Sequence, residues 1–197
     1  MLLENGYVLE FPDGLAFSND EFFDFCQKNP ELKIERDHFF NLIIMSPTGS
    51  LSGFFNGQIL LKLGIWNESN KLGKVFDSSS GFILPDNSVR SPDVSWVSNQ
   101  QWDKLTRVQK MKFAPVCPEF VVELKSPSDS LKELKEKMET YASNGVKLGW
   151  LIDLEAQAVH LYDSKGFIKL VEGFSNNLSG ESVLPGFELD LKFLLEE

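Results

Sequence analysis

The chain has 197 residues, of which 42% are hydrophobic, and this is enough for one domain with a sizeable buried core. Its formal net charge of −10 argues against a protein that coats nucleic acid non-specifically, because such proteins present a basic surface to the phosphates. The apolar runs fall far short of the ~20 residues of a membrane-spanning helix, and the acidic N-terminus does not resemble a signal peptide, so we expect residues 1–197 to form a single cytoplasmic domain.

The first half of the chain predicts two helices with a strand pair between them. Ser18 and Glu21 have the spacing of a capping box, which predicts a helix that begins there. The apolar stretches 32–34 and 40–45 predict neighbouring strands joined by a turn. Apolar residues at helix period over 51–63 then predict the second helix.

The second half predicts mostly strands. In chain order we expect three short strands, a brief helix, a long strand, a long helix and three more strands: 74–77, 81–84, 93–97, 98–105, 118–125, 130–144, 148–153, 157–162 and 167–172. Strand 118–125, helix 130–144 and strand 148–153 form a unit that favours a right-handed crossover between parallel strands. Because the flanking strands are typical of antiparallel hairpins, the sequence predicts an α/β fold with a mixed central sheet.

Two short acidic motifs recur along the chain, and context has to choose among their copies. Asp/Glu-x-Lys occurs four times and Pro-Asp three times, so neither motif is informative alone. Glu123 and Lys125 stand out because they share one face at the end of a strongly apolar strand, where charged groups are expensive to bury without partners. Asp93 stands out because it leads directly into a predicted strand rather than into a turn.

If Asp93 and Glu123 lie on adjacent strands, their carboxylates converge and repel each other unless a proton or a cation bridges them. A hard ion such as Mg²⁺ or Mn²⁺ prefers this oxygen-rich environment, which the backbone carbonyl of Leu124 can complete. Lys125 can then position a water or balance the charge that forms during attack on a phosphodiester. The alternative is that Glu123 and Lys125 form a structural ion pair and Asp93 only begins a strand. The motifs alone favour neither interpretation.

A longer series of motifs resembles the Uma2 family, whose members have the restriction-endonuclease-like PD-(D/E)XK fold. The residues that carry the resemblance are Met45-Ser46-Pro47, Arg90-Ser91-Pro92-Asp93-Val94-Ser95, Val122-Glu123-Leu124-Lys125-Ser126-Pro127-Ser128, Tyr141 with Gly145-Val146, Trp150-Leu151-Ile152-Asp153 and Leu184-Pro185-Gly186-Phe187. Each motif is loose, but the ordered set is specific and covers nearly the whole chain.

The resemblance implies an α/β/α core and Mg²⁺-dependent cleavage of DNA, with catalytic roles for Asp93, Glu123 and Lys125. It also implies that Glu35, on an early strand, reaches the site as a further acid; the alternative, an exposed strand charge, has equal weight. Lys137 is a candidate second base, because many relatives place a lysine in this helix, although a solvated helix face is the simpler interpretation.

Several other side chains are assigned to the fold. Tyr141 and Trp150 have the spacing of core residues, which we prefer to a role in stacking on bases. Many relatives carry a histidine shortly after the Met-x-Pro loop, and this chain has none there. His38 is expected in a turn and His160 at an exposed strand position, so neither replaces it.

Two functions of different classes follow. The first is a metal-dependent endodeoxyribonuclease that hydrolyses phosphodiester bonds through a metal-activated water, with DNA as substrate and Mg²⁺ or Mn²⁺ as cofactor. The second is a catalytically inactive interaction module on the same nuclease fold, which the acidic net charge favours. No membrane partner is expected, and a homodimer is compatible with both. The sequence does not separate DNA from RNA as the substrate.

Overall fold

The central feature of the fold is a six-stranded mixed sheet. A computed structural model of the chain describes residues 2–3, 6–12 and 16–195, and the strands of this sheet have the order β12-β11-β10-β9-β8-β5. Their bounds are β5 (Gly73–Asp77), β8 (Val94–Ser98), β9 (Phe120–Lys125), β10 (Leu148–Asp153), β11 (Ala158–Asp163) and β12 (Gly166–Glu172). β9 and β10 are parallel and the other neighbours are antiparallel, which confirms the predicted mixed sheet.

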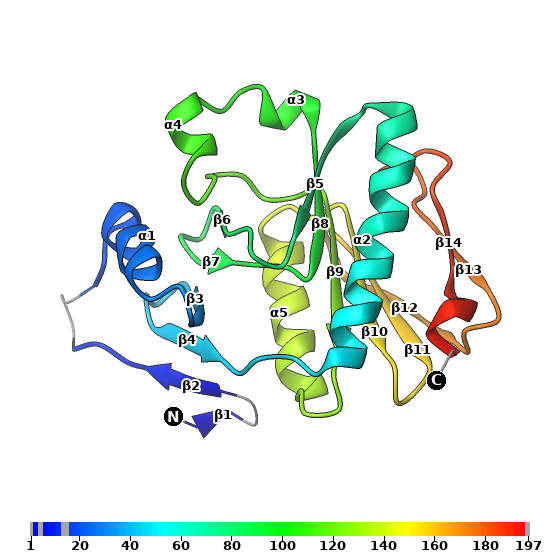
Figure 1. The fold of residues 1–197 in the computed structure, drawn as a ribbon, viewed down its shortest axis with the longest axis horizontal. Coiled ribbons are helices and arrows are strands. Elements are labelled where there is room, and N and C mark those ends of the chain that lie inside the picture. Colours follow the sequence, from blue (N-terminus) through cyan, green and yellow to red (C-terminus); the bar gives the residue numbers. More distant parts are fainter. Residues whose placement is uncertain (1, 4–5, 13–15, 196–197) are drawn as a thin grey trace.

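Two long helices cover the opposite faces of this sheet (Figure 1). Helix α2 (Ser50–Asn70) shares a core with Phe120, Val122 and Leu124 of β9. Helix α5 (Leu131–Ser143) shares the other core with Val121 of the same strand. Since successive strand residues point to opposite faces, β9 is buried from both sides. The result is the α/β/α arrangement that the resemblance implied.

Helix α5 lies close to the sheet because of a glycine on β10. A Cβ on Gly149 would come within 2.5 Å of the terminal methyl of Met138, which belongs to α5. The absence of that side chain allows the helix to approach the parallel pair β9 and β10. The connection from β9 through α5 to β10 is the crossover unit expected from the sequence.

A second six-stranded sheet packs beside the first and contains the N-terminal part of the chain (Figure 1). Its order is β1-β2-β4-β3-β7-β6, with bounds β1 (Leu2–Leu3), β2 (Gly6–Leu9), β3 (Lys33–Arg36), β4 (Leu42–Met45), β6 (Phe82–Ile83) and β7 (Val89–Arg90). Helix α1 (Asn19–Lys28) begins with the predicted capping box and packs on this sheet through a small separate core that includes Phe22.

The remaining elements are short. They are helices α3 (Asn99–Trp102) and α4 (Arg107–Lys110), strands β13 (Asn177–Ser179) and β14 (Glu188–Asp190), and a final 3₁₀ helix (Leu191–Leu195). In the part of the chain that the structure describes, no helix combines the length and apolar character needed to cross a bilayer.

The two sheets are joined at one point that matters for function. β7 of the second sheet, hereafter the outer sheet, ends at Arg90, and β8 of the central sheet begins at Val94. Asp93 therefore lies where the chain passes from one sheet to the other. This junction brings side chains of both sheets to the same end of β9.

Candidate active site

Asp93 directly precedes β8 and lies beside Glu123 of the adjacent strand β9 in the central sheet. β8 and β9 pair antiparallel with Val94 opposite Val122, and the same register continued by one step sets Asp93 against Glu123. One carboxylate oxygen of Asp93, Oδ2, accepts a hydrogen bond from the backbone N–H of Leu124 at 2.9 Å. The side chain of Asp93 stays partly open to solvent, whereas Glu123 is buried.

Glu35 reaches the same place from β3 of the outer sheet. Its Oε2 accepts a hydrogen bond from Nη1 of Arg90 at 3.0 Å, and its Oε1 accepts one from the backbone N–H of Ser91 at 2.9 Å. The Glu35 side chain is only 2% exposed. An exposed strand charge is therefore the wrong interpretation of this residue, and Glu35 belongs with the acids at the junction between the sheets.

Lys137 of α5 bridges two of the acids. Its Nζ lies 2.9 Å from Oε1 of Glu35 and 2.8 Å from Oε1 of Glu123. The hydroxyl of Tyr141, one helical turn further on, donates to the same oxygen of Glu123 at 2.9 Å. The Lys137 side chain is 12% exposed. Its assignment to a solvated helix face is therefore wrong: the lysine points inward because Tyr141 and Met138 place that side of α5 against the sheet.

Burial and the charges of this cluster together shift the pKa values of the two bridged acids in opposite directions. Burial raises the pKa of Glu123, Lys137 lowers it, and the negative charges of Asp93 and Glu35 raise it again, so that it reaches about 7. Burial also acts to raise the pKa of Glu35, but Lys137, Arg90 and the hydrogen bonds outweigh burial and hold it at about 2. Glu35 is thus ionised at neutral pH, while Glu123 exchanges its proton near pH 7.

Lys125 lies at the end of β9 and makes different contacts. Its Nζ is 3.4 Å from Oε2 of Glu155 and 3.9 Å from Oδ1 of Asp153. Asp153 is the last residue of β10, and Glu155 follows the strand. The ammonium that contacts the Glu123 carboxylate in the structure belongs to Lys137, as described above. Leu124, whose carbonyl was predicted to complete a metal site, holds Asp93 through its N–H.

The donor set suits a hard cation in its chemistry. Asp93, Glu123 and Glu35 offer carboxylate oxygens only; burial is the main cause of the raised pKa of Glu123, and the negative charges of Asp93 and Glu35 add to it. Tyr141 and Lys137 both contact Oε1 of Glu123, so Oε2 is the oxygen we consider for an ion. Among the described residues, no three or more His, Cys, Asp or Glu side chains meet closely enough to form a metal site by themselves.

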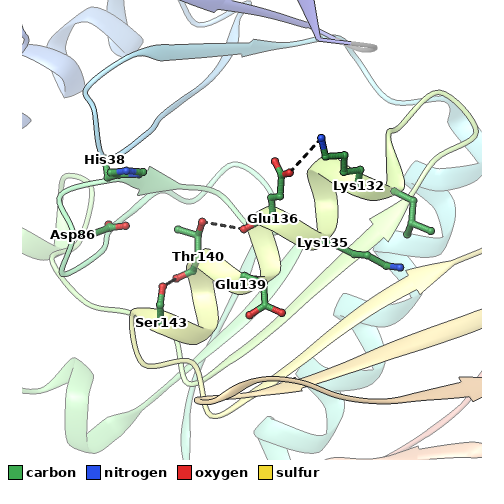
Figure 2. A pocket seen from close by; sticks show the side chains of 9 residues that line it. His38, Asp86, Lys132, Lys135, Glu136, Glu139, Thr140 and Ser143 are labelled. Carbon is green, nitrogen blue, oxygen red and sulfur yellow. Dashed lines mark hydrogen bonds and ion pairs between the residues drawn. The ribbon is translucent and has the colours of Figure 1, made fainter.

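A large hollow lies elsewhere, along the outer side of α5. It has a volume of about 950 Å³ and is lined by charged and polar side chains of the helix, including Lys132, Lys135 and Glu136, with His38 and Asp86 across from them (Figure 2). It is not lined by the acidic cluster, formed by Asp93, Glu123 and Glu35 with Lys137 and Arg90. We give more weight to the acidic cluster, because the hollow is shallow helix surface and its side chains are exposed or only half-buried.

Several members of the cluster were missed or misassigned from the sequence. Arg90, Ser91 and Tyr141 hold the acids, and only the motif around Arg90 gave any signal for the first two. Tyr141 is a core residue, as predicted, but its hydroxyl also contacts Glu123.

Trp150 is fully buried, and His38 lies in a turn, both as predicted. His160 is buried against Phe167 rather than exposed, so that prediction is wrong.

Comparisons with known proteins agree with this architecture. The family model Uma2, described as "Putative restriction endonuclease", matches residues 19–192. The chain is also similar to a solved structure described as a "putative nuclease belonging to DUF820" from Anabaena variabilis ATCC 29413, with 18% sequence identity and a TM-score of 0.72. The match covers 91% of this chain and 97% of that one. Among curated proteins, none matches.

Proposed function

Because the chain belongs to the Uma2 family, whose fold is restriction-endonuclease-like, we propose that it is a metal-dependent endodeoxyribonuclease. The observation that carries this proposal is the placement of Asp93, directly before β8, beside Glu123 of the adjacent strand β9, with a Glu123 pKa raised to about 7. A buried acid held near its protonation midpoint is typical of functional sites, because structural ion pairs usually hold their carboxylates ionised.

We assign the cation to the side of the cluster that Lys137 does not occupy. Asp93 and Oε2 of Glu123 would bind it, with the carbonyl of Leu124 as third protein ligand. A bound Mg²⁺ or Mn²⁺ would act as a Lewis acid on the phosphodiester and lower the pKa of a water. This set has two carboxylates and one carbonyl, so it needs no group of three acids, and none is found among the described side chains. Waters would complete the coordination, because Mg²⁺ usually keeps several of them.

The protein's own groups would then divide the remaining work. Lys137 donates to Glu35 and Glu123 and supplies positive charge near the phosphate, where it would stabilise negative charge that develops during the attack. Glu35 and Arg90 fix the position of Lys137 from the outer sheet. Lys125 stays a second candidate for this role, acting from the end of β9, if it leaves Glu155, whose side chain is 77% exposed.

A catalytically inactive interaction module is the second candidate. The observation that favours it is the Lys137 ammonium, which already lies within 2.9 Å of both Glu35 and Glu123 and so compensates them without an ion. Calorimetric titration with Mn²⁺ separates the two candidates. Binding at or below millimolar concentration, lost in Asp93→Ala, supports the nuclease, whereas absence of binding supports the module.

The decisive experiment is nicking of supercoiled plasmid by purified protein in Mg²⁺ or Mn²⁺. We expect Asp93→Ala to lower the rate by at least about 100-fold, the usual effect of removing a charged group from a reacting centre. Asp86→Ala is the matched control, because Asp86 also follows a proline but hydrogen-bonds Ser88 away from the cluster. Cleavage that persists in Asp93→Ala, or that needs no divalent ion, would refute the proposal.

A further inference from the structure

Helix α2 carries apolar residues on its inner and its outer side. Packing on the central sheet explains those of the inner side only. The inner side packs on the central sheet through Phe55, Ile59, Leu63 and Trp66. The outer side exposes four large apolar side chains to solvent: Leu51 (55%), Phe54 (51%), Leu61 (54%) and Ile65 (62%). In Figure 1 the helix lies over the sheet with no element drawn across its outer side. Large apolar side chains gathered along one exposed side of a helix indicate an interaction site.

The exposed residues follow a seven-residue repeat. Leu51 and Ile65 fall on one position of the repeat and Phe54 and Leu61 on the other, separated by steps of three, seven and four residues. The two remaining positions of the seam inside α2 are polar, Gln58 and Glu68. This is the pattern of a helix that packs along its length against another helix.

Two glycines beside this seam point to the same conclusion. Gly57 and Gly64 lie within the helix, where each costs roughly 1 kcal/mol relative to alanine. A Cβ built on either residue would have no heavy atom within 4 Å, so packing inside the chain does not require a glycine at these positions. Small residues on a helix surface allow a second helix to approach closely.

We propose that the outer side of α2 binds α2 of a second copy of this chain in an antiparallel homodimer. In an antiparallel pair the two positions of the repeat face each other. One register sets Leu61 against Ile65 of the second copy, and the same register sets Gln58 against Glu68. It also brings Phe54 to Leu72, which follows the helix and is 42% exposed. Apolar residues thus meet apolar ones, and the polar positions meet each other.

The few charges on α2 permit a second copy of the chain to approach and favour the antiparallel orientation. A parallel pair in register would set Glu68 against Glu68 of the second copy, which is repulsive. The chain carries a net charge of −10, so most surfaces repel a second copy, but α2 has only Lys62 and Glu68 as charged residues. On the outer side of α2, therefore, two copies can meet without repulsion between like charges.

A competing surface is the edge strand β12, which also exposes Phe167, Ile168 and Leu170. Successive strand residues point to opposite faces, so Ile168 and Leu170 share one face and Phe167 lies on the other. The first of these faces of β12 offers two exposed apolar side chains, whereas the outer side of α2 offers four. Phe167 is moreover engaged by the rings of His160 and Tyr162 within the chain. For these reasons α2 is the better dimer surface, and β12 supplies the control.

The test is sedimentation velocity of the full chain over a wide range of concentration. A contact made mainly by one helix per copy belongs to the small interfaces, under about 1,200 Å² in total, so we expect a reversible dimer. Leu61→Glu should weaken dimerisation by at least about 100-fold, because it sets an unpaired charge in the centre of the contact. Its circular dichroism should be unchanged, since Leu61 is exposed. Ile168→Glu is the matched control and should dimerise as the natural chain does.

A monomer at every concentration overturns the proposal, and so does a dimer that Ile168→Glu disrupts and Leu61→Glu leaves intact. Orientation is tested by disulfide cross-linking. The antiparallel register predicts that a mixture of Leu61→Cys and Ile65→Cys proteins cross-links between the two variants more than either does alone. Predominant self-cross-linking would support a parallel pair and refute the register.

Discussion

Two lysines lie among carboxylates near the carboxyl end of β9, and their surroundings differ. Lys137 bridges Glu35 and Glu123 at 2.9 and 2.8 Å, with all three side chains nearly buried. Lys125 contacts Asp153 at 3.9 Å and the largely exposed Glu155 at 3.4 Å. In the first cluster each charge depends on the others because water cannot replace them, whereas in the second one partner already faces solvent.

The comparison shows that closeness in sequence and closeness in space select different partners. Glu123 and Lys125 share a strand face, but two residues of strand separate them by about 6–7 Å along the sheet. Lys137 is fourteen positions after Glu123 in the chain, and the crossover through α5 returns it to the Glu123 side chain. The following predictions test this difference, beginning with the largest effect.

Removal of each lysine should affect stability very differently. We expect Lys137→Met to lower the free energy of unfolding by about 3–5 kcal/mol, because it leaves two buried acids without their shared cation. Lys125→Met should cost less, roughly 1–3 kcal/mol, because Asp153 is also buried but keeps hydrogen bonds from the backbone N–H groups of Glu155 and Ala156. Urea unfolding at pH 8 in the presence of EDTA measures both values. Equal losses would contradict the distinction between the two clusters.

Neutralising Glu123 should change how stability depends on pH. Its pKa in the folded chain is raised to about 7 from 4.5, so the folded state holds a proton that the unfolded state has lost. The stabilisation of the folded state by this bound proton is therefore fully present below about pH 4.5 and is lost as the pH rises through 7. Glu123→Gln should gain up to roughly 3 kcal/mol relative to the natural chain between pH 4.5 and pH 8. A pH-independent difference would show that Glu123 is not perturbed.

The Tyr141 hydroxyl should have an intermediate effect. Tyr141→Phe removes the hydrogen bond to Oε1 of Glu123 and leaves the ring in the core, so we expect a loss of about 2 kcal/mol at pH 8. The loss should be smaller at pH 5, where Glu123 is protonated. Thermal unfolding at the two pH values gives the comparison, and a loss that is the same at both would exclude a contact to an ionised acid.

The smallest effect is expected at the edge of the Lys125 cluster. Glu155→Gln removes an ion pair whose acid is 77% exposed, which should change the free energy of unfolding by less than about 1 kcal/mol. Added salt should diminish the effect further, because exposed pairs are screened. If this variant were as damaging as Lys137→Met, Lys125 would belong to a tightly coupled cluster as well.

Much of the fold follows from local signals in the sequence. The capping box at Ser18, the apolar strand before Lys125 and the helix that follows it could be located because each depends on neighbours in the chain. Strand periodicity also predicted correctly that Val121 and Glu123 share a face opposite Val122. The partners of Glu35 and Lys137 could not be deduced in this way. They depend on how the outer sheet packs beside the central one and on the rotation of α5, which no local pattern specifies.

The misassignment of His160 has a similar cause. His160 was expected at an exposed strand position, but β11 lies between the two cores: Val159 and Leu161 belong to the core that contains α2 residues, and Tyr162 belongs to the core that contains α5 residues. Five successive residues of β11 are therefore buried. A strand's exposure depends on which elements cover each face. That information comes from the tertiary structure.

The acidic cluster draws one residue or more from each of four elements: β3, β7, β9 and α5. Glu35 and Lys137 are about a hundred residues apart along the chain, so their contact forms only after distant segments have docked. The cluster is therefore a product of the completed fold, and a chain that lacks either segment cannot assemble it.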